Sequence, residues 1–211
     1  MGPIGRTIKR AGDIVAALVV MPVAVVLGVV IGLAVRLEDG GPAVFRQQRV
    51  GLWGRPFVFY KFRTMRMGVD AYGPSPKGEC DERLTRVGRR LRQASLDELP
   101  QLWNVLKGDM SLVGPRPLYL EQAAEWSARQ RRRLEVKPGL TGLAQVSGRA
   151  SLTIEEKLEL DVRYVEEQSL WLDVRILLAT LGQVIGRGDI YERRYSEERE
   201  TWREERSPEE R

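Results

Sequence analysis

Two carboxylates stand side by side at Asp97 and Glu98, and their position in the sequence makes them the clearest candidates for catalysis. The chain has no histidine among its 211 residues, which excludes Ser-His-Asp triads, histidine general bases and histidine-bound metals. Cys80 is the only cysteine, so an intrachain disulfide and a cysteine-cluster zinc site are excluded, and no base lies near it in sequence to activate its thiol. Catalysis therefore falls to carboxylates, lysines and arginines.

The segment after the acidic pair is predicted to begin a helix. Pro100 would disrupt a helix interior but suits a first turn, so the helix should start at about Leu99 with both carboxylates at or just before it. At such a helix mouth both carboxylates can approach one target, and free backbone N–H groups favour phosphate. The alternative is structural, because Ser95 and Glu98 have the spacing of a capping box. The apolar face of the helix contains Leu99, Leu102, Trp103 and Leu106.

Arginines supply the positive charge that a phosphate substrate would need. Arg116 lies between Pro115 and Pro117, so it cannot be helical and loses little freedom when it grips a phosphate oxygen. The net charge is +5, and two stretches free of acidic residues concentrate it. Nucleic acid, anionic lipid headgroups or a phosphorylated small substrate would suit them, and a merely solvated basic face is the alternative. These stretches contain Arg46, Arg49, Arg55, Lys61, Arg63 and Arg66, then Arg83, Arg86, Arg89, Arg90 and Arg92.

A hydrophobic segment near the N-terminus places the protein at a membrane. Residues 14–35 carry no charge over 22 positions, and at about 1.5 Å per residue they would reach roughly 33 Å, enough to span the hydrocarbon core. Basic residues flank both ends, so the positive-inside rule predicts that both ends lie in the cytoplasm. A re-entrant hairpin reconciles the two flanks, with Pro22 breaking or kinking the helix near its middle. An ordinary span with a kink is the alternative.

The elements that position these residues are predicted to form a mainly helical α+β domain. Residues 43–48 and 56–62 should be two strands of a short hairpin. Residues 83–92 should form a helix that is apolar on one side and arginine-rich on the other, which suits a membrane interface as well as an ordinary core. Further helices are expected at residues 118–134, 154–167 and 172–185, an exposed loop at 71–81, and a turn or loop at 138–142.

These elements divide the chain into three parts. We expect a membrane-inserted helix at residues 1–40, a catalytic domain at residues 41–191 and a charged tail at residues 192–211. The tail contains eight Glu and six Arg with few apolar residues, and such a composition is typical of a frayed helix or a disordered segment.

A set of motifs occurs in order along the chain: Lys61-Phe62-Arg63-Thr64-Met65; Leu91-Arg92 with residues 95–102; residues 108–117; and residues 138–142 with Gln145 and Gly148-Arg149. Together they closely resemble the motifs of the monotopic phosphoglycosyl transferases, the bacterial sugar transferase family that starts glycan assembly on a polyprenol phosphate carrier. Each motif alone is weak, but the ordered set is specific and covers nearly everything between Arg6 and Ile185.

The resemblance implies a reaction. A nucleoside diphosphate sugar, usually a UDP-sugar, would donate its sugar phosphate to polyprenol phosphate, giving a polyprenyl diphosphate sugar and UMP. In the family, the aspartate that matches Asp97 attacks the β-phosphate and carries the phosphosugar covalently until the lipid phosphate displaces it. Glu98 would support this reaction through electrostatics, proton transfer or metal binding, and helix capping could coexist with each of these roles.

The resemblance also implies the remaining parts of the site. Magnesium is expected because the donor carries a diphosphate, and Asp97 is its expected ligand. The motif match makes Asp161 a supporting residue. It assigns the substrate phosphates to Lys61, Arg92, Arg116 and Arg149.

The resemblance further implies a re-entrant membrane helix broken at Pro22 and amphipathic helices lying at the interface around the active site. Met21 departs from the pattern, because many members carry serine at this position. The expected location is the cytoplasmic face of the bacterial inner membrane, in contact with membrane lipids. The chain resembles the minimal catalytic form of the family, without the additional spans and N-terminal domain of larger members.

Other interpretations remain open or are disfavoured. Relatives use glucose, galactose and N-acetylated or deoxyamino sugars, and nothing in the motifs selects one. A membrane-anchored scaffold that binds lipid phosphate without catalysis would fit the basic surface, but the intact acidic pair argues against it. Nucleic-acid binding is disfavoured, since no recognition motif is present and the membrane segment accounts for the charge. Downstream glycosyltransferases are natural partners, and the oligomeric state is left open.

Overall fold

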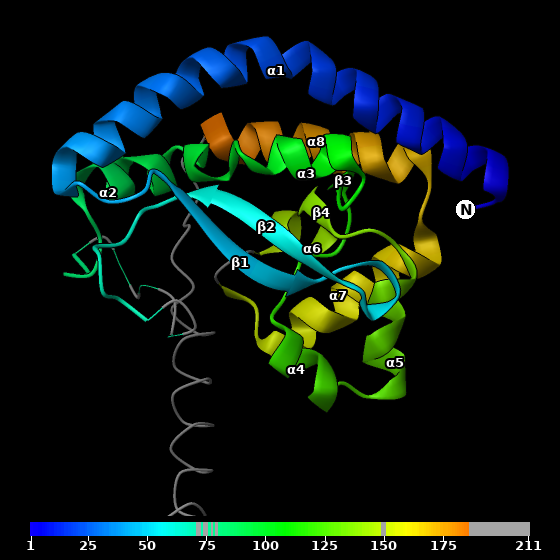
Figure 1. Ribbon diagram of the computed structural model, residues 1–211. Helices are drawn as coiled ribbons and strands as arrows, with labels where there is room; N and C mark the ends of the chain where they lie inside the picture. Colours follow the sequence, from blue (N-terminus) through cyan, green and yellow to red (C-terminus); the bar gives the residue numbers. More distant parts are fainter. Residues whose placement is uncertain (71–72, 74–75, 77, 79, 149–150, 186–211) are drawn as a thin grey trace, which may run out of the picture.

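The computed structural model describes residues 1–70, 73, 76, 78, 80–148 and 151–185, and this part of the chain is mainly helical with two small sheets (Figure 1). A long helix, α1 (Pro3–Asp39), arches over a body built from a hairpin, a pair of parallel strands and shorter helices. The predicted mainly helical α+β fold is confirmed. The tail at residues 192–211 lies outside the described residues.

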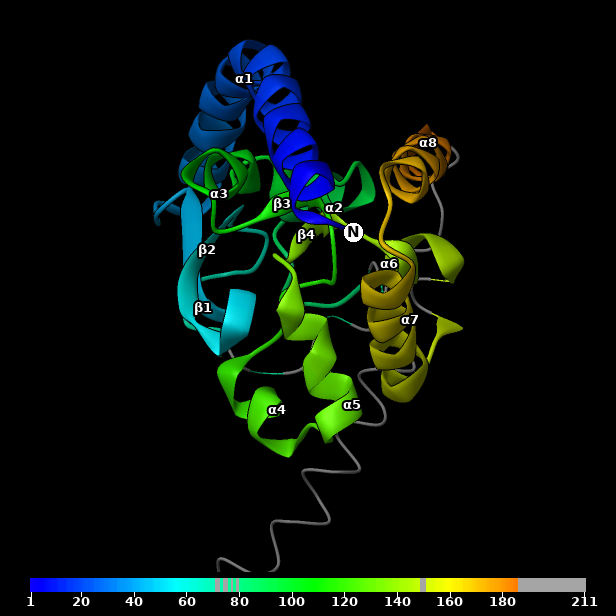
Figure 2. The same ribbon diagram turned by 90° about the vertical axis from the view of Figure 1, so that its right-hand side faces the viewer.

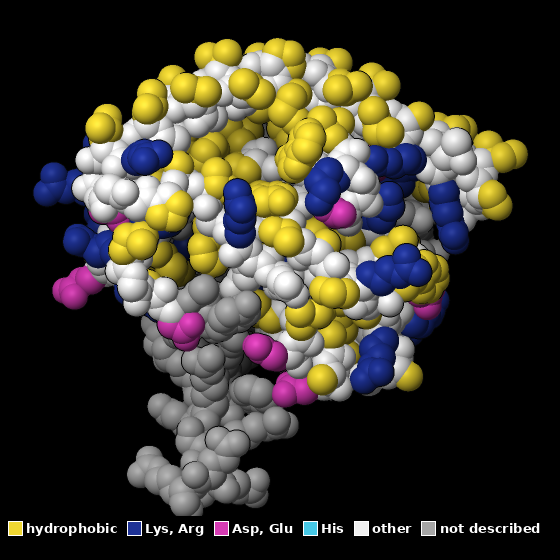
Figure 3. Space-filling view, viewed as in Figure 1, with side chains coloured by type: hydrophobic (Ala, Val, Ile, Leu, Met, Phe, Trp, Pro, Cys, Tyr) yellow, Lys and Arg dark blue, Asp and Glu magenta, His cyan; other side chains and the backbone are white. Residues whose placement is uncertain are grey.

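Helix α1 contains the hydrophobic segment. By length and composition it could cross a membrane, since its most apolar window has a mean hydropathy of 3.1 and is only 11% buried. Pro22 lies inside the helix, which continues across it as an arch rather than stopping there (Figure 1). A proline in a helix removes one hydrogen bond and favours such a bend. Hydrophobic side chains cover the outer face of the arch (Figure 3).

The predicted hairpin is confirmed: its second strand has the predicted bounds, and its first strand begins one residue later and ends two residues later than predicted. Strands β1 (Val44–Val50) and β2 (Pro56–Phe62) pair antiparallel and are joined through a 3-10 turn, η1 (Leu52–Gly54). Helix α3 (Gln101–Lys107) lies against β2, where the Asn104 amide donates to the carbonyl of Val58 at 2.7 Å. The buried core between α1, β2 and α3 contains Ala17, Ala24, Phe59, Leu102, Val105 and Met110.

A pair of short parallel strands forms the second sheet. Strand β3 (Ser111–Val113) pairs with β4 (Gly139–Thr141), so the prediction of a turn or loop throughout residues 138–142 is wrong at its centre. Glycine is required here by close packing: a Cβ on Gly139 would lie 2.1 Å from the backbone nitrogen of Gly114. Glycines that signal a turn in the sequence therefore serve a close approach of two backbones.

Seven further helical segments belong to the described part of the chain. They are α2 (Arg86–Gln93), α4 (Leu120–Glu125), α5 (Ala128–Arg131), the 3-10 helix η3 (Arg132–Glu135), α6 (Leu143–Ser147), α7 (Ile154–Glu167) and α8 (Leu170–Ile185). A single helix at residues 118–134 is a wrong prediction, because buried Trp126 is extended and Ser127 starts α5 by accepting a hydrogen bond from Gln130 N. Helices α1 and α8 lie on the same side of the molecule (Figure 2).

Candidate active site

Asp97 lies in a 3-10 turn, η2 (Leu96–Glu98), just before α3. This agrees closely with the expected position at a helix mouth. The capping-box alternative is not realised, because Ser95 has a φ of 54° and its side chain makes no capping hydrogen bond. Asp97 is 8% exposed, and among the described residues its carboxylate accepts no hydrogen bond. Burial without a hydrogen bond disfavours the charged form of a carboxylate.

Three cations approach this carboxylate from different elements. Burial raises the pKa of Asp97, and the neighbouring Glu98 raises it further. Lys61, Arg92 and Arg116 act in the opposite direction. The fold therefore brings together residues of β2, of α2 and of the turn after β3, which are far apart in sequence.

Lys61 is held in an unusual environment on β2. Its Nζ lies 5.3 Å from the centre of the Phe45 ring on the opposite strand. Burial, followed by the charge of Arg92, lowers the pKa of Lys61 to about 8, while Asp97 acts to raise it. A dianionic phosphate beside Lys61 would pair with the ammonium group and so offset the effects of burial and of Arg92.

Glu98 is paired with the arginine of the Pro-Arg-Pro turn. Nη2 of Arg116 donates to Oε1 of Glu98 at 2.9 Å. The Arg116 side chain is 46% exposed and that of Glu98 is 23% exposed, so an incoming phosphate can reach the guanidinium. The pair holds Arg116 beside the acidic turn.

Asp161 does not touch Asp97 or Glu98; it forms a buried ion pair with Arg133. Both side chains are almost fully buried, and Nε of Arg133 donates to Oδ2 of Asp161 at 3.0 Å. Nη2 of Arg133 also donates to the backbone carbonyl of Arg116 at 2.6 Å. Asp161 thus supports the site indirectly, by holding the arginine that holds the Pro-Arg-Pro turn.

Arg133 is a site residue that sequence reasoning missed. It lies in a run of arginines whose members look alike in sequence, and only the fold distinguishes it. Its guanidinium stacks 4.7 Å from the centre of the Trp126 ring, which completes its burial. The pairing of Arg133 with Trp126 seven residues earlier is the signal that could have identified it.

The other predicted site residues have different outcomes. Arg92 lies in the last turn of α2, and its charge acts to lower the pKa of Asp97. Arg149 lies outside the described residues.

Within the described part of the chain, no group of three or more Asp, Glu, His or Cys side chains is placed to hold a metal ion. Asp97 and Glu98 therefore offer only a pair of carboxylates.

The structure thus combines a buried carboxylate near three cations with a helix long and apolar enough to enter a membrane, features that suit a phosphorylated substrate at a membrane. The chain belongs to the bacterial sugar transferase family, whose profile matches residues 4–187. The resemblance to the phosphoglycosyl transferases is confirmed, and with it the expected class of enzyme.

Three relatives illustrate the likeness. The chain is 47% identical over 178 residues to a Bacillus subtilis protein named uncharacterized sugar transferase EpsL, covering 84% of this chain and 87% of that protein. It is 43% identical over 202 residues to a UDP-glucose:undecaprenyl-phosphate glucose-1-phosphate transferase of Caulobacter vibrioides, covering 90% of this chain and 76% of that protein. It is 43% identical to galactosyl transferase CpsE of Streptococcus agalactiae, covering 84% of this chain but only 42% of that longer protein.

Proposed function

We propose that the protein transfers a sugar 1-phosphate from a UDP-sugar to undecaprenyl phosphate, or a similar polyprenol phosphate, and releases UMP. The observation that carries this proposal is the buried Asp97 carboxylate, which accepts no hydrogen bond among the described residues and lies within the field of three cations. Relatives named for transfer of glucose 1-phosphate or galactose phosphate to undecaprenyl phosphate support the same reaction type.

The chemistry proceeds in two displacements. An Oδ atom of Asp97 attacks the β-phosphorus, the bond from that phosphorus to the bridging oxygen breaks, and UMP leaves with this oxygen. A phosphate oxygen of the polyprenol phosphate then attacks the phosphorus of the phosphosugar-aspartate. The acyl phosphate bond breaks, the diphosphate forms, and Asp97 returns to its carboxylate form. An ionised carboxylate needs no general base in either step.

The surrounding cations stabilise the charge that develops on the phosphoryl oxygens. Lys61 and Arg92 approach Asp97 from β2 and α2, and Arg116 approaches from the turn held by Glu98. They also keep the reactive form of Asp97 available by opposing the effect of burial on its pKa. Fixed charges in a site of low polarity act more strongly than in water and need no reorganisation during the reaction.

Magnesium fits this site as an ion that arrives with the donor diphosphate. Mg²⁺ is commonly held by one or two carboxylates together with substrate phosphates, and the adjacent Asp97 and Glu98 match that donor set. Mutual repulsion of these carboxylates contributes to the raised pKa of Asp97, and a cation would relieve it. Asp97 is the proposed protein ligand, and the ion would neutralise charge on the diphosphate.

The contacts of α1 support insertion from one side of the membrane. Near its N-terminus, Lys9 Nζ lies 2.7 Å from Oδ2 of Asp173 in α8. At its C-terminus, Glu38 accepts hydrogen bonds from α2. Since both ends bind the same body, a re-entrant arch keeps these contacts, whereas a span would separate them. We place the body on the cytoplasmic face of the inner membrane.

Helix α8 extends the apolar surface of α1. The two helices lie on the same side of the molecule (Figure 2). Helix α8 exposes a row of large hydrophobic side chains. This row matches the amphipathic helix expected at a membrane interface. It contains Leu170, Trp171, Val174, Leu178, Leu181 and Val184.

A topology test uses cysteines placed before Arg6 and after Glu38 in a Cys80→Ser background. Sealed vesicles of one orientation are treated with a membrane-impermeant maleimide. Both cysteines are expected to react from the same side. Labelling from opposite sides would refute the arch and favour an ordinary span.

The reaction is tested by measuring UMP release from a panel of UDP-sugars with polyprenol phosphate and magnesium. One donor is expected to give turnover in the wild type and none in Asp97→Asn. Binding of polyprenol phosphate without UMP release from any donor would instead support a non-catalytic scaffold. Near-normal turnover in Asp97→Asn would exclude Asp97 as the nucleophile.

A further inference from the structure

Charged side chains of α1 contact the elements that carry the site residues. Arg10 donates from Nη1 to the carbonyl of Val105 at 2.7 Å and from Nη2 to that of Leu106 at 3.0 Å, at the end of α3. Asp39 pairs with Arg63, two residues after Lys61 in the chain. A basic residue that the positive-inside rule explains therefore also makes specific bonds within the protein.

Asp13 binds the strand that leads to Arg116. It is 7% exposed, and its Oδ2 accepts from Oγ of Ser111 at 2.7 Å, while its Oδ1 accepts from the backbone N–H of Leu112 at 3.3 Å. Both partners lie in β3, and Arg116 follows this strand within three residues. The N-terminal half of α1 therefore holds one side of the site.

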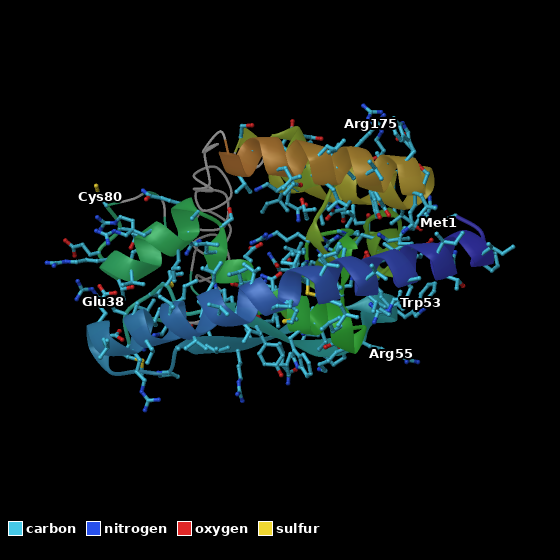
Figure 4. The ribbon with its side chains drawn as sticks, turned by 90° about the horizontal axis from the view of Figure 1, so that it is seen from above. Met1, Glu38, Trp53, Arg55, Cys80 and Arg175 are labelled. Carbon is cyan, nitrogen blue, oxygen red and sulfur yellow. The ribbon has the colours of Figure 1, made fainter. Side chains whose placement is uncertain are left out.

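Glu38 binds the helix that carries Arg92. Its Oε1 accepts from the backbone N–H of Arg86 at 2.6 Å, and its Oε2 accepts from that of Val87 at 3.0 Å. Thr85 accepts from the next free N–H, that of Gly88, at 2.9 Å. The first three N–H groups of α2 are thus satisfied, two of them by a side chain from α1. Figure 4 shows Glu38 at the end of α1 beside α2.

The two acids are placed at opposite ends of one arch. Asp13 lies before the bend at Pro22 and Glu38 lies one residue before the end of α1. Arg116 follows β3 by three residues and Arg92 lies in α2, and both cations act on Asp97. Helix α1 therefore binds both elements, one on each side of its bend.

We propose that Asp13 and Glu38 are positioning residues for the transfer reaction: Asp13 fixes β3 and through it Arg116, and Glu38 fixes α2 and through it Arg92. The inference rests on the proposed function. It gives α1 a second role, because a helix that enters the membrane also aligns the phosphate-binding cations.

Kinetics of the full-length protein in vesicles test the proposal. Glu38→Ala should lower kcat/KM for the UDP-sugar about fivefold, the scale of a lost helix cap, mainly through KM. Glu82→Ala is the matched control and should leave kinetics unchanged. It removes an exposed acid just before α2, and this side chain makes no hydrogen bond or ion pair with α2 among the described residues. The fraction of protein that floats with vesicles should be equal for the wild type, Glu38→Ala and Glu82→Ala.

Coupling between sites distinguishes positioning from general destabilisation. In an Arg92→Lys background, Glu38→Ala should lower kcat/KM by less than about a further twofold. In an Arg116→Lys background, Glu38→Ala should lower kcat/KM by as much as it does in the wild type. Asp13→Asn should show the reverse pattern. Equal effects of each variant in both backgrounds would overturn the proposal.

Amide hydrogen exchange provides a readout that does not depend on activity. Glu38→Ala should speed exchange in α2 and leave exchange in β3 unchanged, and Asp13→Asn should do the opposite. Unchanged exchange of α2 in Glu38→Ala would overturn the role of Glu38. If the wild type released no UMP from any donor, the proposed function would fail, while the exchange pattern would still decide whether α1 holds these elements.

Discussion

Arg116 donates from Nη2 to Oε1 of Glu98 at 2.9 Å, although 18 residues separate them in the chain. This bond distinguishes the two adjacent carboxylates, because Glu98 has a cationic partner while Asp97 accepts no hydrogen bond among the described residues. We therefore expect Asp97, rather than Glu98, to attack phosphorus. Glu98 instead holds the arginine that would receive the phosphate.

Asp97→Asn should abolish UMP release without destabilising the protein. Activity should fall at least about 1000-fold, since the nucleophile is lost. Burial and Glu98 raise the pKa of Asp97 above its unfolded value, so the ionised carboxylate disfavours the folded state near neutral pH. The neutral amide should leave the melting temperature equal or higher at pH 7. Any gain in melting temperature should vanish at a pH below the pKa of Asp97 in the unfolded protein, where Asp97 is protonated in both the folded and the unfolded state.

Asp161→Asn is the control for that experiment. Asp161 is also buried, but it is paired with Arg133, and the substitution leaves this guanidinium without its counter-charge. The free energy of unfolding should fall by about 3–5 kcal/mol. A large destabilisation by Asp97→Asn, comparable to that of Asp161→Asn, would show that Asp97 is structural.

The rate should depend on pH through Lys61. Its pKa in the free enzyme is lowered to about 8, so its charge is present at pH 7 and is lost as the pH rises through 8. We expect kcat/KM for the UDP-sugar to fall above pH 8, because this parameter reports ionisations of the free enzyme. Lys61→Arg keeps its charge at these pH values and should remove the decline. An identical alkaline limb in Lys61→Arg would assign the titration to another group.

Magnesium removal should stop the reaction reversibly. With excess EDTA, UMP release is expected to cease, and added Mg²⁺ should restore it, because the described residues contain only a pair of carboxylates to hold a metal and the diphosphate must complete the ligand set. Ca²⁺, which prefers more ligands at longer distances, should restore much less. Full turnover in EDTA would show that the protein cations alone neutralise the diphosphate.

Local patterns in the sequence predicted much of this fold. The hairpin, α7 and α8 follow from the spacing of apolar residues, and the chemistry proposed for Asp97 comes from the motifs. The strand pair β3–β4 could not be predicted, since its pairing is long-range and its glycines mimic a turn. The partners of Asp161 and Glu38 were missed for the same reason, because side-chain contacts between distant segments leave no local signal.

Stability and positioning by Arg133 can be separated with paired substitutions. Arg133→Met leaves Asp161 buried without a partner, so the free energy of unfolding should fall by about 3–5 kcal/mol. Adding Asp161→Leu removes that buried charge, and much of the lost stability should return, as it does when buried ion pairs are replaced by apolar groups. Activity should not return, because the carbonyl of Arg116 still lacks the donor that Arg133 provides at 2.6 Å.

The double variant is assessed by thermal unfolding and by KM for the UDP-sugar. Restored melting temperature together with a raised KM would establish that the pair aligns the Pro-Arg-Pro turn. If stability and KM recovered together, the Arg133–Asp161 pair would serve the fold alone, and the hydrogen bond from Arg133 to the carbonyl of Arg116 would have no part in binding the donor.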